Sequence, residues 1–368
     1  MRLHIFNPEH DTVMAYGNGM FTSPHAAREL RRDLGFIAAL WAEDGDFVLV
    51  DDIEATLESV RHVRKYSSDV IFVTSADLRN IRYDEIPNFS IEPWGWDDVL
   101  KRQLVSAAPD LLRYIPDAVT IERIRSMSNR RFAFEKLLPW LCDADESFVG
   151  KSRYCTTMEE MNDELACNGS SVLKAPWSSS GRGVRYVNGQ AEKPLSGWCR
   201  NVISRQGGIM VEPFYNKVMD FGMEFCVNDS GLSEYCGLSL FRTVNGSYTG
   251  NILATEKEKR RMIGRYVSVE MIDRLAVLVS ERMDCVAGEY YKGPFGVDMM
   301  VVADNSGTGF KVHPCVELNL RRTMGHVALS ISPDEHEAQK LMRIFYSGKY
   351  RLRVVCTNEN LLNTSLAV

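Results

Sequence analysis

Apolar and polar positions alternate in short blocks along the first third of the chain. Apolar runs at residues 2–6, 47–50 and 70–73 have the length of strands, and the stretches between them show helical spacing. The helices predicted there cover residues 26–41, 60–66 and 97–107. Strands that alternate with helices predict a small parallel sheet flanked by helices, in an α/β domain that we place at residues 1–117. Ligands of such sheets bind beyond the carboxyl ends of the strands.

The remainder of the chain is predicted to be an α+β region of two lobes, residues 118–207 and 208–350, with a tail at residues 351–368. The first lobe begins with a helix over 120–138, which Pro139 ends. Its other predicted elements are strands at 148–155 and 171–175 and helices at 158–167 and 195–205. The second lobe has predicted strands at 208–215, 220–227 and 235–243, a helix at 269–283, a hairpin within 293–326 and a helix at 334–346.

The composition is that of a globular protein, because 45% of the residues are hydrophobic and 25% are charged. A net charge of −6 argues against a general binder of nucleic acid or of membrane surfaces. No apolar run approaches the length of a membrane span, and the first residues do not have the pattern of a signal peptide. The nine cysteines include no CxxC pair, which favours reduced thiols in a cytoplasmic protein over disulfides or a zinc site.

The predicted hairpin carries a candidate metal site. Glu317 and Asn319 lie two residues apart on a strand, so their side chains share one face, and an antiparallel partner strand can bring Asp298 beside them. Three hard oxygen donors on rigid strands suit Mg²⁺, or Mn²⁺, especially when nucleotide phosphates supply further ligands. The alternative is an ordinary strand pair with surface acids. Arg321 and Arg322 follow directly, where they can hold the anion that the metal binds.

A second motif, VLKAPWSSSGRGVRYV, lies between two predicted strands of the first lobe. Lys174 ends the first strand, and the small residues that follow let the backbone approach a ligand, so that successive N–H groups can hold phosphate oxygens. The loop residues considered for this role are Ser179, Ser180, Gly181 and Gly183. This is not a Walker A loop, because the lysine precedes the glycines. The alternative is a flexible hairpin turn, but a lysine at the strand end favours phosphate binding.

Two further segments contain candidate binding residues. The segment Glu212-Pro213-Phe214-Tyr215 ends a strand, and its proline leaves backbone groups for an adenine edge. Asp220 and Glu224 follow on one face of the next strand. The first predicted strand is followed by a dense polar segment, which can form a substrate-binding loop or, alternatively, a polar turn. Its candidate residues are Asn7, Glu9, His10 and Asp11.

The order of these motifs resembles the ATP-grasp superfamily, which includes D-alanine–D-alanine ligase, biotin carboxylase and carbamoyl-phosphate synthetase. The resemblance covers residues 126–326, and the N-terminal α/β domain is similar to the domain that usually precedes this fold. It implies a two-lobed ATP-grasp domain with ATP and Mg²⁺ as cofactors. It also implies that Lys174 contacts the α- and β-phosphates, that the serine- and glycine-rich loop covers the phosphates, and that the metal ligands are Asp298, Glu317 and Asn319.

The resemblance assigns further roles on the nucleotide side. Glu212 and the backbone around Phe214 and Tyr215 match the segment that contacts adenine. Asp220 is close to the position of the acid that binds the ribose, with an offset that the sequence leaves open. Arg130 stands where the superfamily usually has a second lysine, so a planar guanidinium replaces a point charge there.

On the substrate side, Arg321 matches an arginine that contacts the reacting anion, and we regard it, with Lys174, as catalytic. Arg322 and His326 are candidates for the same wall of the site. For His326 the alternative is a helix cap.

The implied activity is that of an ATP- and Mg²⁺-dependent ligase. Such an enzyme activates a carboxylate as an acyl phosphate, joins it to an amine-type nucleophile and releases ADP and phosphate. The same residues would serve a small-molecule kinase, and a non-catalytic nucleotide-binding protein is the third alternative. The expected partners are small, amino-acid-like substrates and a second copy of the chain in a homodimer. Neither nucleic acid nor a membrane is expected as a partner.

Overall fold

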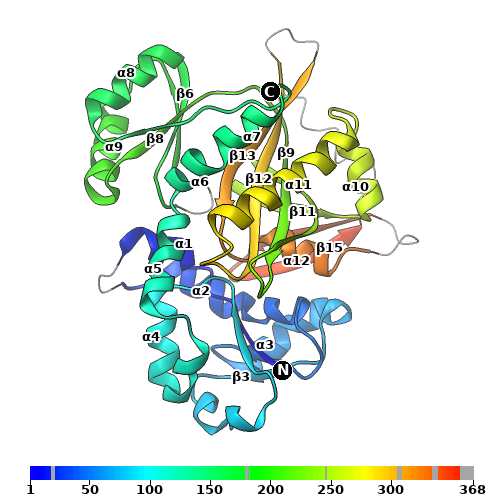
Figure 1. The fold of residues 1–368 in the computed structure, drawn as a ribbon. Helices are drawn as coiled ribbons and strands as arrows, with labels where there is room; N and C mark the ends of the chain where they lie inside the picture. The colour runs from blue at the N-terminus through cyan, green and yellow to red at the C-terminus, as the bar shows by residue number, and fades with distance from the viewer. Residues whose placement is uncertain are drawn as a thin grey trace.

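The computed structural model describes residues 1–17, 21–178, 181, 183–244, 247–304, 309–333 and 339–356. The N-terminal domain (blue and cyan) lies at one end of the molecule, a large sheet occupies the middle, and a small lobe with α8 and α9 projects at the other end (Figure 1). An α/β domain is thus followed by an α+β region, as the hydrophobic pattern predicts. No helix in the described part of the chain is long and apolar enough to cross a membrane.

The N-terminal domain is built on a parallel four-stranded sheet in the order β3-β2-β1-β4. Its strands are β1 (Arg2–Ile5), β2 (Phe47–Leu49), β3 (Ile71–Val73) and β4 (Ser90–Pro93). Its α-helices are α1 (His10–Tyr16), α2 (His25–Leu34), α3 (Ile53–Val60) and α4 (Asp98–Ala107). Short 3₁₀ helices lie at residues 35–40, 61–66, 77–80, 83–85 and 109–114. The sequence analysis missed α1 and β4, because both are short: α1 has seven residues and β4 has four.

Three helices connect this domain to the small lobe, where the sequence predicted one helix over 120–138. They are α5 (Ala118–Met127), α6 (Arg130–Lys136) and α7 (Leu138–Ala144). Asn129 starts α6 anew, because its side chain accepts a hydrogen bond from the backbone of Arg131. Pro139 lies in the first turn of α7, where its missing N–H is not needed, so the prediction that it ends a helix is wrong.

The small lobe has an antiparallel sheet in the order β5-β8-β6-β7. Its elements are β5 (Arg153–Cys155), α8 (Met158–Asn168), β6 (Ser170–Lys174), β7 (Val184–Asn188), α9 (Lys193–Gln206) and β8 (Ile209–Pro213). The strand predicted at 148–155 is reduced to β5 and an isolated bridge at Phe148. Because β8 belongs to this sheet, we place the boundary between the lobes after Pro213 instead of at residue 207.

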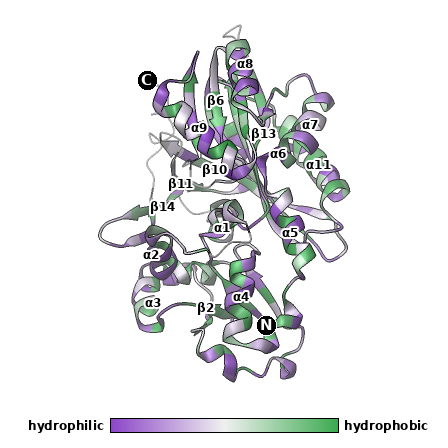
Figure 2. Ribbon diagram, turned by 90° about the vertical axis from the view of Figure 1, so that its left-hand side faces the viewer, coloured by the Kyte–Doolittle hydropathy of each residue, from purple (hydrophilic) through white to green (hydrophobic). Residues whose placement is uncertain are grey.

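The second lobe is an antiparallel seven-stranded sheet in the order β13-β12-β9-β10-β11-β14-β15. Its strands are β9 (Lys217–Val227), β10 (Ser233–Val244), β11 (Ser247–Leu253), β12 (Gly293–Ala303), β13 (Phe310–Asn319), β14 (Lys340–Tyr346) and β15 (Tyr350–Cys356). Its helices are α10 (Glu256–Ile263), α11 (Val269–Val286) and α12 (Met324–Ser330). Hydrophobic residues run along these strands (Figure 2). The stacked rings of Phe225 and Phe295, 4.9 Å apart, pack in the same core as α11.

The end of the chain differs from the prediction. The helix expected at 334–346 is wrong for residues 340–346, which form β14, and residues 334–338 lie outside the described part. Residues 351–356, expected in the tail, lie in β15. These strands form because each pairs with a strand of the large sheet, and Met342 and Leu352 pack against Phe6 and Leu34 of the N-terminal domain. Strand pairing between segments far apart in the sequence therefore determines the secondary structure of this region.

The two faces of α11 allow a matched test of this core. Val279 is fully buried, whereas Val277 on the same helix is 56% exposed. Val279→Ala should lower the free energy of unfolding by about 2 kcal/mol, because the lost methyl groups leave a cavity. Val277→Ala should change it by less than about 0.5 kcal/mol. Denaturant unfolding measures both changes, and equal losses would contradict the packing described.

Candidate active site

Two neighbouring strands bring together the three residues predicted as metal ligands. Asp298 on β12 lies directly opposite Glu317 on β13 in the antiparallel register. The side-chain amide of Asn319 donates a hydrogen bond of 3.2 Å to Asp298 Oδ2. The three side chains therefore converge as the hairpin pattern predicted, while their metal-binding role stays a prediction.

A third acid, Glu224 on the adjacent strand β9, is buried beside them. It is paired with Gly296 of β12, where any side chain would collide with the Glu224 carboxylate. Thr323 Oγ1 donates to Glu224 Oε2 over 2.7 Å, and His326 Nδ1 lies 2.9 Å from the same oxygen. The sequence analysis placed Glu224 on one face with Asp220 but missed it as a site residue. Glu224 comes close to the predicted metal ligands only because the strands are arranged in the order β13-β12-β9.

The electrostatics of this cluster fit a cation. Burial and the neighbouring carboxylates of Glu317 and Glu224 raise the pKa of Asp298 well above its usual range. A divalent cation would relieve this repulsion, and carboxylate and amide oxygens suit Mg²⁺. Among the described residues, no group of three His, Cys, Asp or Glu side chains is arranged to hold a metal ion by itself. A Mg²⁺ ion bound by Asp298, Glu317 and Asn319 would therefore need further oxygen ligands, which nucleotide phosphates can supply.

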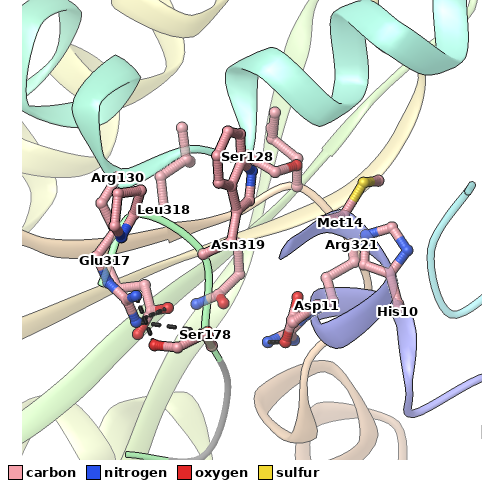
Figure 3. A pocket seen from close by; sticks show the side chains of 13 residues that line it. His10, Asp11, Met14, Ser128, Arg130, Ser178, Glu317, Leu318, Asn319 and Arg321 are labelled. Atoms are coloured by element: carbon pink, nitrogen blue, oxygen red, sulfur yellow. Dashed lines mark hydrogen bonds and ion pairs between the residues drawn. The ribbon is translucent and has the colours of Figure 1, made fainter. Parts of the chain in front are cut away.

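Arg130 connects the loop after β6 with the strand of the predicted metal ligands. It lies in the first turn of α6, and its side chain is buried. One guanidinium nitrogen donates to Glu317 Oε1 over 2.6 Å, and another donates to the carbonyl oxygen of Ala175 (2.6 Å) and to Ser178 Oγ (2.7 Å). Figure 3 shows this bridge between the two lobes. A fixed positive charge thus stands where the resemblance implied a lysine.

Lys174 and Glu212, predicted for phosphate and adenine, face each other from the adjacent strands β6 and β8. Lys174 Nζ lies 2.6 Å from Glu212 Oε2 and donates to the carbonyl oxygen of Val316 over 3.2 Å. Both side chains are buried. The lysine therefore reaches across to β13 beside the acid cluster, which is a suitable place for a group that contacts phosphates.

The predicted phosphate loop closes on the end of β6, since the carbonyl oxygen of Gly183 accepts a backbone hydrogen bond from the residue after the strand. Glycine is required at 183, because a side chain there would collide with Ser178. Gly181 has a positive φ of 72°, which glycine adopts without strain. Ser179 and Ser180 lie outside the described residues.

Arg321 forms a bidentate ion pair with Asp11 of the N-terminal domain. Its Nε and one terminal nitrogen lie 2.8 and 2.7 Å from the two carboxylate oxygens. Burial alone would raise the pKa of Asp11, but the charge and hydrogen bonds of Arg321 outweigh it and lower that pKa. Both side chains line one cavity with Arg130, Glu317 and Asn319 (Figure 3). The arginine predicted to hold the reacting anion thus holds a carboxylate of the protein.

The other N-terminal candidates are fixed by partners in their own domain. Asn7 Nδ2 donates to Asp97 Oδ2 over 3.1 Å, and His10 Nδ1 lies 3.2 Å from the same oxygen. Glu9 is paired with Arg31 at 2.6 Å, and burial raises its pKa. Of these three candidates, His10 alone lines the cavity. Asn7 and Glu9 do not line this cavity, and both the substrate-binding role and the alternative of a polar turn stay predictions for them.

Arg322 is not among the residues that line this cavity, and its role toward the substrate stays a prediction. Its guanidinium lies 4.7 Å from the ring centroid of Trp41 in the N-terminal domain. His326 forms a capping box with Thr323 at the start of α12, so it is a helix cap, and its imidazole also contacts Glu224.

The residues predicted to contact adenine and ribose make contacts with other parts of the protein. The backbone N–H of Phe214 donates to Ser170 over 2.9 Å, so it is not free for a base, and its side chain is exposed. Tyr215 packs edge-on against His313, with the ring centroids 5.3 Å apart. The carboxylate of Asp220 accepts hydrogen bonds from a lysine and a threonine of the large sheet. Their nucleotide contacts stay predictions.

His313 on β13 is a buried residue that the sequence analysis missed. Its strand pairs it with Met300, and neither ring nitrogen has a hydrogen-bond partner within the described residues. Burial and the charge of Lys174 lower its pKa to about 3, so the ring is neutral near pH 7. A single histidine in an apolar strand gives no sequence signal, so only the packing reveals it.

Comparisons with known proteins give the fold. No protein-family model matches the chain, and no curated protein matches its sequence. A protein from Archaeoglobus fulgidus described as belonging to the ATP-grasp superfamily has a similar structure, with a TM-score of 0.50 and 13% identity over 97% of this chain and 100% of that one.

Two further similar structures are the biotin carboxylase domain of Hydrogenobacter thermophilus 2-oxoglutarate carboxylase and Staphylococcus aureus N5-carboxyaminoimidazole synthetase complexed with ADP. The first has a TM-score of 0.49 and 12% identity over 93% of this chain and 74% of that chain. The second has a TM-score of 0.48 and 11% identity over 94% of this chain and 82% of that chain. The chain described here has the ATP-grasp fold, preceded by an N-terminal α/β domain.

His313 predicts a specific pH dependence of stability. Histidine in an unfolded chain has a pKa of about 6.5, whereas the folded value is about 3, so between them the unfolded chain binds one more proton. The free energy of unfolding should therefore decrease as the pH is lowered through this window, by up to about 1.4 kcal/mol per pH unit. His313→Leu should remove this contribution, measured by denaturant unfolding between about pH 4.5 and pH 6. The same change at the exposed His62 should leave this contribution in place. If the free energy of unfolding changed equally with pH in the wild type and in both variants, the role given to His313 would be contradicted.

Proposed function

We propose that the protein is an ATP- and Mg²⁺-dependent ligase that joins a carboxylate to an amine and releases ADP and phosphate. The observation that carries the proposal is the convergence of Asp298, Glu317 and Asn319 with the buried Arg130 at the junction of the two lobes. A cleft that served only as a scaffold would not need buried charges gathered in this way, since each is costly to desolvate.

Each group has a role in this reaction. When bound, ATP supplies the phosphoryl group that activates the substrate carboxylate, and Mg²⁺ neutralises phosphate charge. Asp298, Glu317 and Asn319 would hold the metal, while Lys174 and Arg130 would bind phosphate oxygens. Arg321 would orient the substrate anion and stabilise the negative charge that develops during transfer. The work of these residues is positioning and charge stabilisation, without a covalent intermediate on the protein.

A small-molecule kinase would use the same phosphate-binding residues, so substrate tests must separate the two. ADP release from MgATP is measured with a panel of carboxylic acids, alone and with amines that include the amino acids. A ligase should require both substrates and should form an amide bond, identified by mass spectrometry. Turnover without an amine, together with a stable phosphorylated product, would contradict the ligase and identify the kinase.

Asp298→Asn separates catalysis from stability. Because Glu317 and Glu224 disfavour its ionised form, removal of this charge should leave the free energy of unfolding unchanged or raise it. ADP release should nevertheless fall at least about 100-fold, because a metal ligand is weakened. Asp163→Asn on the exposed face of α8 is the control and should keep wild-type turnover. Wild-type turnover in Asp298→Asn would show that the metal site is misassigned.

The remaining predictions concern the whole protein. Amino-acid-like substrates, a homodimer and a cytoplasmic location are proposed on the resemblance and the cysteine pattern. The division into an N-terminal domain ending near residue 117 and two lobes also remains our proposal. Size-exclusion chromatography with light scattering would test the dimer directly.

A further inference from the structure

The N-terminal domain contains a cavity of about 760 Å³, here called the N-domain cavity. None of the described residues lines both this cavity and the one that holds Asp11 and Arg321. Volumes of about 300–1,000 Å³ are typical of sites for small organic ligands. The N-domain cavity is therefore large enough for a ligand of its own, apart from the candidate active site.

The N-domain cavity lies at the carboxyl ends of three parallel strands. Phe6 and Asn7 follow β1, Val50 and Asp51 follow β2, and Ser75 comes shortly after β3. Residues of α4 form the opposite wall. Open parallel sheets bind ligands at this edge, because the loops that leave the strands diverge there.

The floor of the N-domain cavity is apolar and rigid. Val50, Leu78, Leu100 and Leu104 line it, and each is less than 5% exposed. These side chains belong to the packed core of the domain and have no room to rearrange. A ligand with an apolar body would bury its own carbon surface against this floor, and such burial is the main source of affinity in sites of this kind.

The rim of the N-domain cavity is positively charged. Arg31, Arg79 and Arg102 reach it from three separate elements, and Asp51 is the one carboxylate in its described lining. Arg31 is already compensated, since it lies 2.6 Å from Glu9 and 3.5 Å from Asp51. The two other arginines decide the charge of the rim.

Among the described residues, Arg79 and Arg102 have no carboxylate partner. The guanidinium of Arg79 donates to the carbonyl oxygens of Ala107 (2.7 Å) and Ser106 (3.2 Å), which orient it without cancelling its charge. Arg102 makes no hydrogen bond or ion pair within the described part of the chain. In a chain of net charge −6, two uncompensated arginines at one cavity are a local excess of positive charge.

We propose that the N-domain cavity binds a small organic anion, whose apolar body contacts the floor and whose carboxylate, sulfonate or phosphate group is held by Arg79 and Arg102. This proposal does not depend on the ATP-dependent activity. The bound anion contacts the segment that leads to the candidate active site, because Asn7 lines the N-domain cavity and Asp11, on the same segment, is paired with Arg321.

The probe for the test is 8-anilinonaphthalene-1-sulfonate, which combines fused aromatic rings with one sulfonate. Fluorescence titration of the full chain should show saturable binding of one equivalent. Arg102→Gln should weaken it about tenfold, because a charge-assisted contact is lost. N-phenyl-1-naphthylamine, which lacks the sulfonate, should also bind about tenfold more weakly. Arg82→Gln, an exposed arginine outside the cavity, is the matched control and should bind as the wild type does.

A second variant, Leu104→Trp, tests the floor, because a larger side chain fills the cavity and should abolish binding, with circular dichroism to confirm folding. Equal affinity of the wild type and Arg102→Gln would overturn the proposal, as would an absence of saturable binding. Displacement of the probe by MgADP would also overturn it, since the probe would then lie in the candidate active site. Arg102 is exposed and has no hydrogen-bond or ion-pair partner among the described residues, so Arg102→Gln should leave folding unchanged, which circular dichroism checks.

Discussion

A cluster of three acids on adjacent strands is the constraint on which the arrangement of the lobes depends. Asp298 on β12 lies opposite Glu317 on β13, and the buried Glu224 lies on the neighbouring strand β9, opposite Gly296. A buried carboxylate without a partner costs several kcal/mol, so each needs a donor from elsewhere in the chain. Glu317 receives Arg130 from α6, and Glu224 is held at the start of α12. Within the described residues Asp298 accepts a hydrogen bond from the Asn319 amide alone, and burial together with the two neighbouring carboxylates raises its pKa.

The N-terminal domain is attached to this centre in two chemically different ways. The ion pair between Asp11 and Arg321 fixes the start of α1 at the candidate site. On the outer strands of the large sheet, Met342 and Leu352 bury apolar surface against Leu34. The apolar contact has no directional requirement, whereas the bidentate pair sets orientation. In the proposed ligase, a substrate anion competes with Asp11 for Arg321 or binds beside the pair.

Local patterns predicted the parts of the site that lie on single strands. The two-residue period of a strand correctly placed Glu317 and Asn319 on one face. The sequence also predicted that Lys174 ends its strand, and it is the last residue of β6. The order of the motifs was sufficient to indicate the ATP-grasp fold, which the similar structure supports at only 13% identity. Fold information of this kind survives in hydrophobic pattern and motif order after most residue identities have changed.

The sequence by itself therefore determined the fold class, the two strands of the hairpin that carries Asp298, Glu317 and Asn319, and the chemistry of the side chains on them. Tertiary structure decided which side chains meet: Arg130 with Glu317, Arg321 with Asp11 at 310 positions' separation, and Glu224 beside Asp298. It also turned residues 340–346 into a strand. The physical reason is that pairing across a sheet or between domains depends on burial and on the desolvation of distant charges, which no local period records.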